Sequence, residues 1–238
     1  MILPLFALFA AAQNPKSFED LELAKIVTWH NVKHMRFEEK LTSTEENGDV
    51  HVIGVSVLIQ GDKSRASLKI DDQPLLISLT NPPESWVVAP SQKKYFQQKI
   101  DTTKRPAFDA KEHLLKADPD TFNLTFDTDE PIRFGPAKKF VIRSFTTVRE
   151  GGESLRKVEA TITNKEGRSL VVTQWFLLDK WIVKRFTVAR SGQSSKIAMK
   201  GVATTIDFEP NAKDSEFVLD RSTIAGFEKA GLPPKLGS

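Results

Sequence analysis

The sequence contains no cysteine. A chain without cysteine forms no disulfide bond, and it cannot be acylated through the cysteine of a lipoprotein signal. A long hydrophobic run is also missing, because the apolar stretch at residues 1–12 is too short to cross a bilayer and stop there. We therefore expect a soluble, exported protein rather than one anchored in a membrane.

Catalytic motifs are missing as well. The sequence has no Gly-x-Ser-x-Gly elbow, no His-Glu-x-x-His pair and no Gly-x-Gly-x-x-Gly phosphate loop. None of its histidines lies near a serine motif; they are His30, His34, His51 and His113. A hydrolase would need a clustered nucleophile, base and orienting group, which this pattern does not offer. We expect no enzymatic activity, no metal and no cofactor.

The charge of the chain is nearly balanced. Its formal net charge is +3 with an isoelectric point near 9.0, and 27% of its residues are charged. Such a mild excess does not favour nucleic acid as a partner and would at most favour contact with anionic lipid surfaces. At 238 residues, the length fits one all-β domain.

The first residues are typical of a secretory signal. Residues 1–12 (MILPLFALFAAA) are uncharged and apolar, and they end in three small alanines before Gln13. We expect cleavage after Ala12, a mature domain at residues 13–238, and a periplasmic or secreted protein. The alternative is a buried N-terminal strand or helix of a cytosolic protein.

A helix is predicted to follow. Ser17 is a good N-cap before an acidic first turn, and the helix is expected to run to Val32 or His34. Its apolar stripe indicates that it lies across a sheet. Within it, His30 and His34 have the i,i+4 spacing of two metal ligands on one helix face. No carboxylate or cysteine stands at a spacing that would complete a site, so we interpret both as surface or helix-end residues.

Residues 35–99 have the pattern of antiparallel strands joined by tight turns. In residues 35–44, Met35, Phe37, Glu39 and Leu41 alternate with Arg36, Glu38, Lys40 and Thr42. Residues 49–60 are apolar on both faces at their centre, whereas the strand around Leu68 has one apolar and one polar face. Turns are predicted at Asn47-Gly48, Gly61-Asp62 and Asp71-Asp72. Together these strands indicate a curved meander with an apolar inner face.

The chain then changes character and returns to strands. Residues 107–117 are predicted to form a short helix, a candidate lid whose packed side chains are Phe108, Leu114 and Leu115. A plain connecting helix is the alternative. Turn signals at intervals of ten to thirteen residues then predict strands at 139–149, 154–164, 169–178, 181–190 and 196–208.

Two segments carry a resemblance to a known family. Ser85-Trp86-Val87-Val88-Ala89-Pro90, followed by a polar turn and Lys93-Lys94-Tyr95-Phe96, resembles the periplasmic outer-membrane lipoprotein carriers with the LolA-like fold. The tail, with residues 214–220, 224–227 and 232–234, resembles the family's closing segment, in which a Phe-x-hydrophobic strand completes the sheet. Gln60-Gly61 stands where the family has Arg-Pro, which leaves open whether such a chain transfers a lipoprotein to a receptor.

The resemblance implies a fold and a function. The fold is an unclosed antiparallel β-barrel of about eleven strands, strongly curved, with helices covering its mouth around an apolar cavity. The function is non-enzymatic binding or transport of a lipid or a lipoprotein acyl chain, by a monomer that meets a membrane-associated donor or acceptor protein. The alternative is a sensor, regulatory or scaffold domain of the same fold that binds a protein partner.

The strand patterns predict which side chains line the cavity. These are the inward apolar residues Phe37, Leu41, Val55, Val57, Ile59, Leu68, Ile77, Trp86, Val88, Trp175 and Trp181. A slip of one residue in the pairing of a strand would turn its whole set outward. A deep apolar cavity would favour a carrier, and a polar cleft with convergent titratable groups would favour an enzyme.

Overall fold

The computed structural model describes residues 17–44, 48–101, 137–164, 167–191 and 197–232. The chain divides into two compact units. The first unit comprises Met1–Asn31 and Phe108–Lys200, and the second comprises Val32–Ala107 and Gly201–Ser238. The predicted signal at residues 1–12 and the candidate lid with Phe108, Leu114 and Leu115 lie outside the described residues, and the single-domain boundary stays a prediction.

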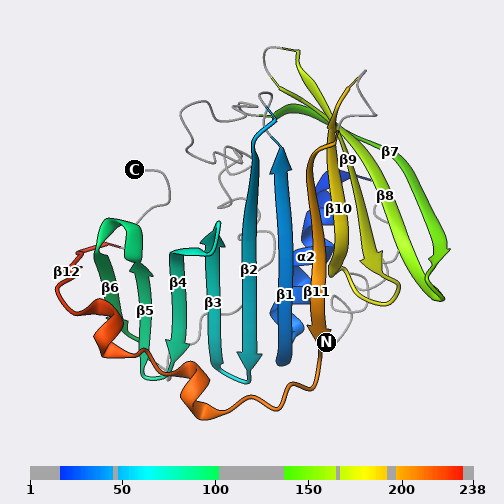
Figure 1. Cartoon of the computed structure of the whole chain (residues 1–238). Coiled ribbons are helices and arrows are strands. Elements are labelled where there is room, and N and C mark those ends of the chain that lie inside the picture. The colour runs from blue at the N-terminus through cyan, green and yellow to red at the C-terminus, as the bar shows by residue number, and fades with distance from the viewer. Residues whose placement is uncertain (1–16, 45–47, 102–136, 165–166, 192–196, 233–238) are drawn as a thin grey trace. The chain divides into compact units, whose positions relative to one another are not determined.

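The described part of the chain is mostly β, as the sequence predicts (Figure 1). Its twelve strands are hydrogen-bonded in the order β12-β6-β5-β4-β3-β2-β1-β11-β10-β9-β8-β7. The order has two terminal strands, β12 and β7, so the sheet is not closed. The expectation of an unclosed antiparallel sheet is confirmed, with one strand more than the eleven expected and one parallel pair, β12 with β6.

The second unit is built on a meander of hairpins. Its strands are β1 (His34–Thr44), β2 (Val50–Gln60), β3 (Lys63–Ile70), β4 (Gln73–Asn81), β5 (Glu84–Ala89) and β6 (Lys94–Lys99). The turn after β2 places Gly61 at a φ of 59°, and the turn after β3 places Asp71 at 47°. Both turns were predicted, because glycine and aspartate adopt these left-handed conformations at low cost.

The pairing register divides the side chains of the second unit between two faces. Directly paired residues of antiparallel strands point to the same side of a sheet. Glu39 pairs with Val55, and Val55 pairs with Leu68, so these three share one face. On the other face, Glu38 pairs with Ser56. The same row of paired residues extends across the sheet to Ser67, Ile77, Val88 and Tyr95.

The C-terminal segment, residues 208–232, follows the last long strand, β11 (Ile197–Asp207). It contains two 3₁₀ helices, η3 (Asp214–Phe217) and η4 (Arg221–Ile224), and the two-residue strand β12 (Glu228–Lys229) beside β6. The prediction of a closing strand at 214–220 is therefore wrong. The Glu216 carboxylate accepts from the Lys213 N–H at 2.9 Å and Asp220 accepts from the Ser222 N–H at 2.9 Å, and such local bonds favour turns over a strand ladder.

The first unit packs a helix onto its strands. Its elements are α2 (Phe18–Asn31), β7 (Ala137–Glu150), β8 (Glu153–Asn164), β9 (Ser169–Leu177), β10 (Val183–Arg190) and the start of β11. Helix α2 begins as predicted, with the Asp20 N–H donating to Ser17 Oγ at 3.1 Å. The core cluster contains Leu21, Ala24, Val158, Phe176 and Trp181. The expected packing of this helix on a sheet is thus confirmed.

Helix α2 ends at Asn31, three residues earlier than the longest predicted extent. His34 is instead the first residue of β1, where it pairs with Gln60, and the Gly61 N–H donates to the Lys33 carbonyl at 2.7 Å. Strand pairing therefore begins where helical propensity alone would have continued. Because His30 and His34 belong to different elements, they do not form a helical i,i+4 pair.

The side chain of Phe217 is expected to hold the C-terminal segment against the strands of the second unit. Its side chain is fully buried, and it lines the same small cleft as Leu79 and Trp86. Replacing Phe217 by alanine should lower the free energy of unfolding by about 3 kcal/mol, because the truncation leaves a cavity. Urea unfolding measures this loss. Val218→Ala is the matched control, since Val218 is 55% exposed and its truncation should change stability by less than about 0.5 kcal/mol. Equal unfolding midpoints for the two variants would contradict the assignment.

Candidate functional site

One face of the second unit carries a set of neighbouring apolar side chains, which we call the apolar wall. It is formed by alternate residues of β1, β2 and β3, which the pairing register places on the same side. Its members are Met35, Phe37, Leu41, Ile53, Val55, Val57, Ile59, Ala66, Leu68 and Ile70. The predicted cavity residues Phe37, Leu41, Val55, Val57, Ile59 and Leu68 are all among them.

The wall is only partly covered. The β1 residues Phe37 and Leu41 are buried, with 5% and 8% of their surface exposed. By contrast, Val55, Val57 and Leu68 are half-buried, although they lie in the middle of their strands. Further along the sheet, the register adds the half-buried Leu76, Val87 and Phe96 to the same face. A face that combines apolar composition with partial exposure is able to cover an apolar ligand.

A single carboxyl group interrupts the wall. Glu39 lies between Phe37 and Leu41 on β1 and pairs with Val55. Its Oε1 atom is buried and has no hydrogen-bond partner among the described residues. Burial in these surroundings raises the pKa of Glu39 to about 7. The sequence pattern already placed Glu39 on the apolar side of its strand, but the strand pattern alone gave no sign of its missing partner.

Three predicted cavity residues lie on the opposite face. Ile77 pairs with Ser67 and Val88, and Trp86 pairs with Leu79, all on the side that bears Glu38. Trp86 and Val88 are 7% and 0% exposed there. The prediction that these three side chains share a wall with Phe37 is therefore wrong. Both parities of residues 75–79 and 86–88 are apolar, so the sequence pattern does not decide which set faces inward.

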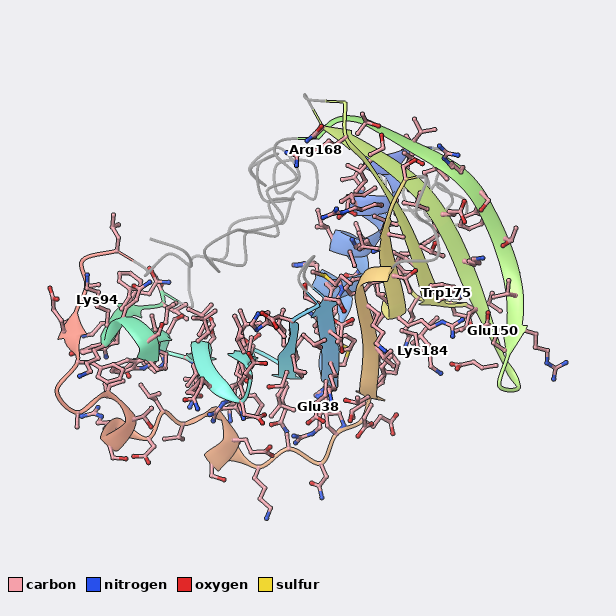
Figure 2. The ribbon with its side chains drawn as sticks, turned by 45° about the horizontal axis from the view of Figure 1, so that its top comes forward. Glu38, Lys94, Glu150, Arg168, Trp175 and Lys184 are labelled. Atoms are coloured by element: carbon pink, nitrogen blue, oxygen red, sulfur yellow. The ribbon has the colours of Figure 1, made fainter. Side chains whose placement is uncertain are left out.

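The two predicted tryptophans of the first unit have other surroundings. Trp181 is a core residue whose ring meets Phe176 edge-on at 5.2 Å between centroids. Trp175 pairs with Lys157 and Arg185, and the Arg185 guanidinium lies 4.2 Å from its ring centre. Arg185 also forms an ion pair with Glu150, and Figure 2 shows Trp175 and Glu150 at the same end of these strands.

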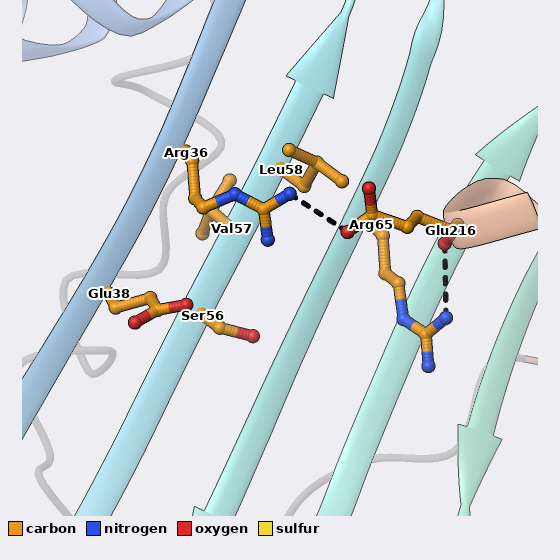
Figure 3. Close-up of a pocket in the computed structure, with 7 residues that line it drawn as sticks. All are labelled: Arg36, Glu38, Ser56, Val57, Leu58, Arg65 and Glu216. Carbon is orange, nitrogen blue, oxygen red and sulfur yellow. Dashed lines mark hydrogen bonds and ion pairs between the residues drawn. The ribbon is translucent and has the colours of Figure 1, made fainter. Parts of the chain in front are cut away.

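A small polar cleft lies on the other face of the second unit, beneath the C-terminal segment (Figure 3). It encloses about 150 Å³ and is lined by Arg36, Glu38, Ser56, Val57, Leu58, Arg65 and Glu216. Arg36 Nη2 lies 2.8 Å from Glu216 Oε1, and Arg65 Nη1 donates to the Glu216 carbonyl at 3.0 Å. The hydrogen bond from Arg36 holds the pKa of the Glu216 carboxyl below its usual range.

These contacts attach the C-terminal segment to the strands. Lys63 adds an ion pair with Asp214, with 2.6 Å between Nζ and Oδ1. Sequence reasoning missed this set, because the partners are separated by about 150 to 180 residues and their attraction leaves no periodic signal. Arg65, five residues after Gln60, thus binds the C-terminal segment. Gln60 and Gly61 themselves end β2 and form the turn to β3.

The described residues contain no group of three or more His, Cys, Asp or Glu side chains that could hold a metal ion. In the same part of the chain, every helix is too short or too polar to cross a membrane. The described site therefore offers an apolar surface with one carboxyl group.

Comparison with known proteins finds similarity of fold alone. No family model and no curated protein matches the sequence. Among solved structures, MucB is similar with 8% identity and a TM-score of 0.42 over 86% of this chain and 62% of MucB, so the chain spans less than two thirds of that protein. A LolA superfamily protein from Nitrosomonas europaea is similar with 10% identity and a TM-score of 0.37, over 84% of this chain and 96% of that one.

The lipoprotein LppX of Mycobacterium tuberculosis is also similar, with 10% identity and a TM-score of 0.35 over 87% of this chain and 98% of that one. These solved structures are similar to the chain in fold alone. The identities and TM-scores are low, so the similarity carries no argument about what this chain binds.

Glu39 should make the stability of the protein depend on pH. Its pKa is about 7 in the folded chain and about 4.3 in an unfolded one, so the folded state holds a proton that the unfolded state has lost between these values. The contribution is fully present below about pH 4 and is lost as the pH rises to 7. The free energy of unfolding should fall by at most about 4 kcal/mol over this window.

Urea unfolding at several pH values tests this expectation. Glu39→Gln should flatten the profile between pH 4 and 7 and be more stable than the wild type at pH 8, because no charge is then buried. Glu38→Gln, the neighbouring change on the opposite face, should retain the wild-type slope. A Glu39→Gln profile that matches the wild type would show that this carboxyl does not titrate as described.

Proposed function

We propose that the protein is a non-enzymatic binder or carrier of a lipid, whose acyl chain lies along the apolar wall of the second unit. The observation that supports this is the wall itself: half-buried valine and leucine side chains at the centre of the paired strands β2 and β3. Side chains in the middle of a sheet are normally covered on an apolar face. Partial exposure at this position favours a ligand that completes the cover.

An acyl chain fits the chemistry of the wall better than a polar ligand does. Apart from Glu39, the wall side of β1 between Met35 and Leu41 is hydrocarbon, and so is the paired stretch of β2 from Ile53 to Ile59. Removing hydrocarbon from water stabilises a complex by about 0.8 kcal/mol per methylene group, so a chain that is only half covered would still bind. A flexible chain can also follow the pleat of the strands without specific hydrogen bonds.

Export belongs to the same proposal. The apolar segment at residues 1–12 is typical of a secretory signal, and we infer cleavage after Ala12 and a periplasmic or secreted location. A protein that carries lipid between membranes in that space would meet a membrane-associated donor and an acceptor. Phe108, Leu114 and Leu115 remain a predicted lid, and release of the lipid would need either the acceptor or a motion of such a lid.

Native mass spectrometry of the mature protein, purified without detergent and then extracted with organic solvent, tests the proposal. We expect stoichiometric lipid to accompany the wild-type protein. If no lipid is found and an added fluorescent fatty alcohol does not bind, the wall is covered by the chain itself. The alternative of a regulatory or scaffold domain that binds a protein partner then takes precedence.

Two matched variants of β2 test whether the lipid binds to the apolar wall. Val57→Lys should weaken binding of the fluorescent alcohol by at least about tenfold, because a buried ammonium would have to be desolvated. Val50→Lys is the control, since Val50 is 54% exposed and pairs with Thr44 on the opposite face. Fluorescence titration measures both affinities, and circular dichroism verifies that both variants are folded. Equal losses in the two variants would place the ligand elsewhere.

A further inference from the structure

The position of Glu39 puts a titratable group at the centre of the apolar wall. Along β1 its neighbours on that face are Phe37 and Leu41, and across β2 it faces Val55, with Leu68 next on β3. An acyl chain that crosses these three strands near their middle must therefore pass over the carboxyl group. Its buried Oε1 atom finds no hydrogen-bond partner among the described residues that would hold a negative charge.

Other charged groups of the second unit do not face Glu39. On the wall side of β2 the titratable residue is His51, which is four residues from Val55, or about 13 Å along the strand. His51 is engaged with Asp71, with 3.0 Å between Nδ1 and Oδ2. On β3 the wall side carries Ser64, Ala66, Leu68 and Ile70, while Arg65 and Lys69 point to the other face.

Strand β11 brings one charged residue to this side, Lys200, which is exposed and belongs to the first unit. It lies five residues, or about 16 Å along the strand, from Thr205. Thr205 Oγ1 lies 3.1 Å from Glu38 Oε2, which places Thr205 on the face opposite to the wall. Alternation then assigns Asp207, the charged residue of β11 within the second unit, to that same opposite face. On β1 itself, Arg36, Glu38 and Lys40 also alternate away from the wall. Within the described strands of this unit, Glu39 thus lacks a countercharge.

We propose that an acyl chain binds to the apolar wall together with one proton, which neutralises Glu39 as hydrocarbon covers its carboxyl group. This inference rests on the proposed function and adds its regulation. Covering an ionised carboxylate with hydrocarbon removes its hydration without replacing it, which is far more costly than covering the neutral acid. The pKa of about 7 means that the proton is held near neutral pH before any ligand arrives.

The proposal also selects a class of ligand. It favours uncharged hydrocarbon over the carboxyl group, with any anionic head group lying away from Glu39. In the opposite arrangement, the ligand would be a cationic amphiphile, and its ammonium group would pair with the ionised Glu39 carboxylate. These two arrangements predict opposite dependences of affinity on pH, so one titration separates them.

The experiment measures the affinity of the full-length mature protein for a pyrene-labelled fatty alcohol between pH 6 and pH 9. Wild-type affinity should be constant below pH 7 and should fall by up to about tenfold per pH unit above it, because the protonated fraction falls in that proportion. Glu39→Gln should bind at pH 9 as tightly as the wild type binds at pH 6. Glu38→Gln should follow the wild type.

A second readout counts the proton directly. Isothermal titration calorimetry at pH 8, in two buffers with different ionisation enthalpies, should give an uptake of close to one proton for the wild type and none for Glu39→Gln. Circular dichroism at each pH establishes that the variants remain folded. Wild-type affinity that does not change with pH, with no proton uptake, would overturn the inference while leaving the proposed function in place.

A pyrene-labelled alkylammonium tests the opposite case, in which the ionised Glu39 carboxylate binds a cationic ligand. If it bound more tightly as the pH rises, and lost this gain in Glu39→Gln, then Glu39 would be a carboxylate that holds a cation, and proton-coupled binding would be wrong. If neither probe bound to the wild type or to Glu39→Gln at any pH, the proposed function would fail and the inference with it.

Discussion

The register between β1 and β2 is the constraint on which the second unit depends. The pairing of Glu39 with Val55 assigns Phe37 and Leu41 to one face and Arg36 and Glu38 to the other. A shift of one residue would exchange the two sets, because side chains alternate with a period of two. The apolar wall would then carry Arg36, and the C-terminal segment would lose the guanidinium that binds Glu216. The pairing of β1 with β2 therefore determines both the apolar wall and the attachment of the C-terminal segment.

The two faces of this unit are completed by different chemistry. On the face with Arg36, the protein's own C-terminal segment supplies carboxylates for Arg36 and Lys63 and a buried aromatic ring, Phe217. The apolar wall offers no comparable charges, so an acidic segment such as residues 214–216 would gain nothing there. This difference in charge separates an internal attachment site from a surface suited to hydrocarbon.

Much of the fold could be predicted from local chemistry. The turns at Gly61 and Asp71 were found because few residue types tolerate their backbone conformation, and the faces of β1 to β3 were found because apolar and polar residues alternate there. Prediction failed where alternation is lost. Ile77 and Val88 stand in apolar runs, so only hydrogen bonding with neighbouring strands decides their face.

The candidate site shows the same limit. Its β1, β2 and β3 members could be identified from the sequence, but the ion pairs of the C-terminal segment connect residues far apart in the chain. Trp175 illustrates a further reason: large aromatic residues serve cores, ligand sites and stacking on cations alike, and in this protein its ring is flanked by Lys157 and Arg185. Residue type could not choose among these roles.

The pairing of β5 with β6 has a spectroscopic consequence. Tyr95 is the single tyrosine of the chain, and its ring centre lies 5.9 Å from that of Trp86. Tyr95 also pairs with Lys229 of β12, while Trp86 lines a cleft with the buried Phe217. Excitation energy absorbed by Tyr95 is therefore transferred to Trp86, which lines a cleft with residues of the C-terminal segment. Weak tyrosine emission is thus the expected optical signature of the β5–β6 pairing, without any added label.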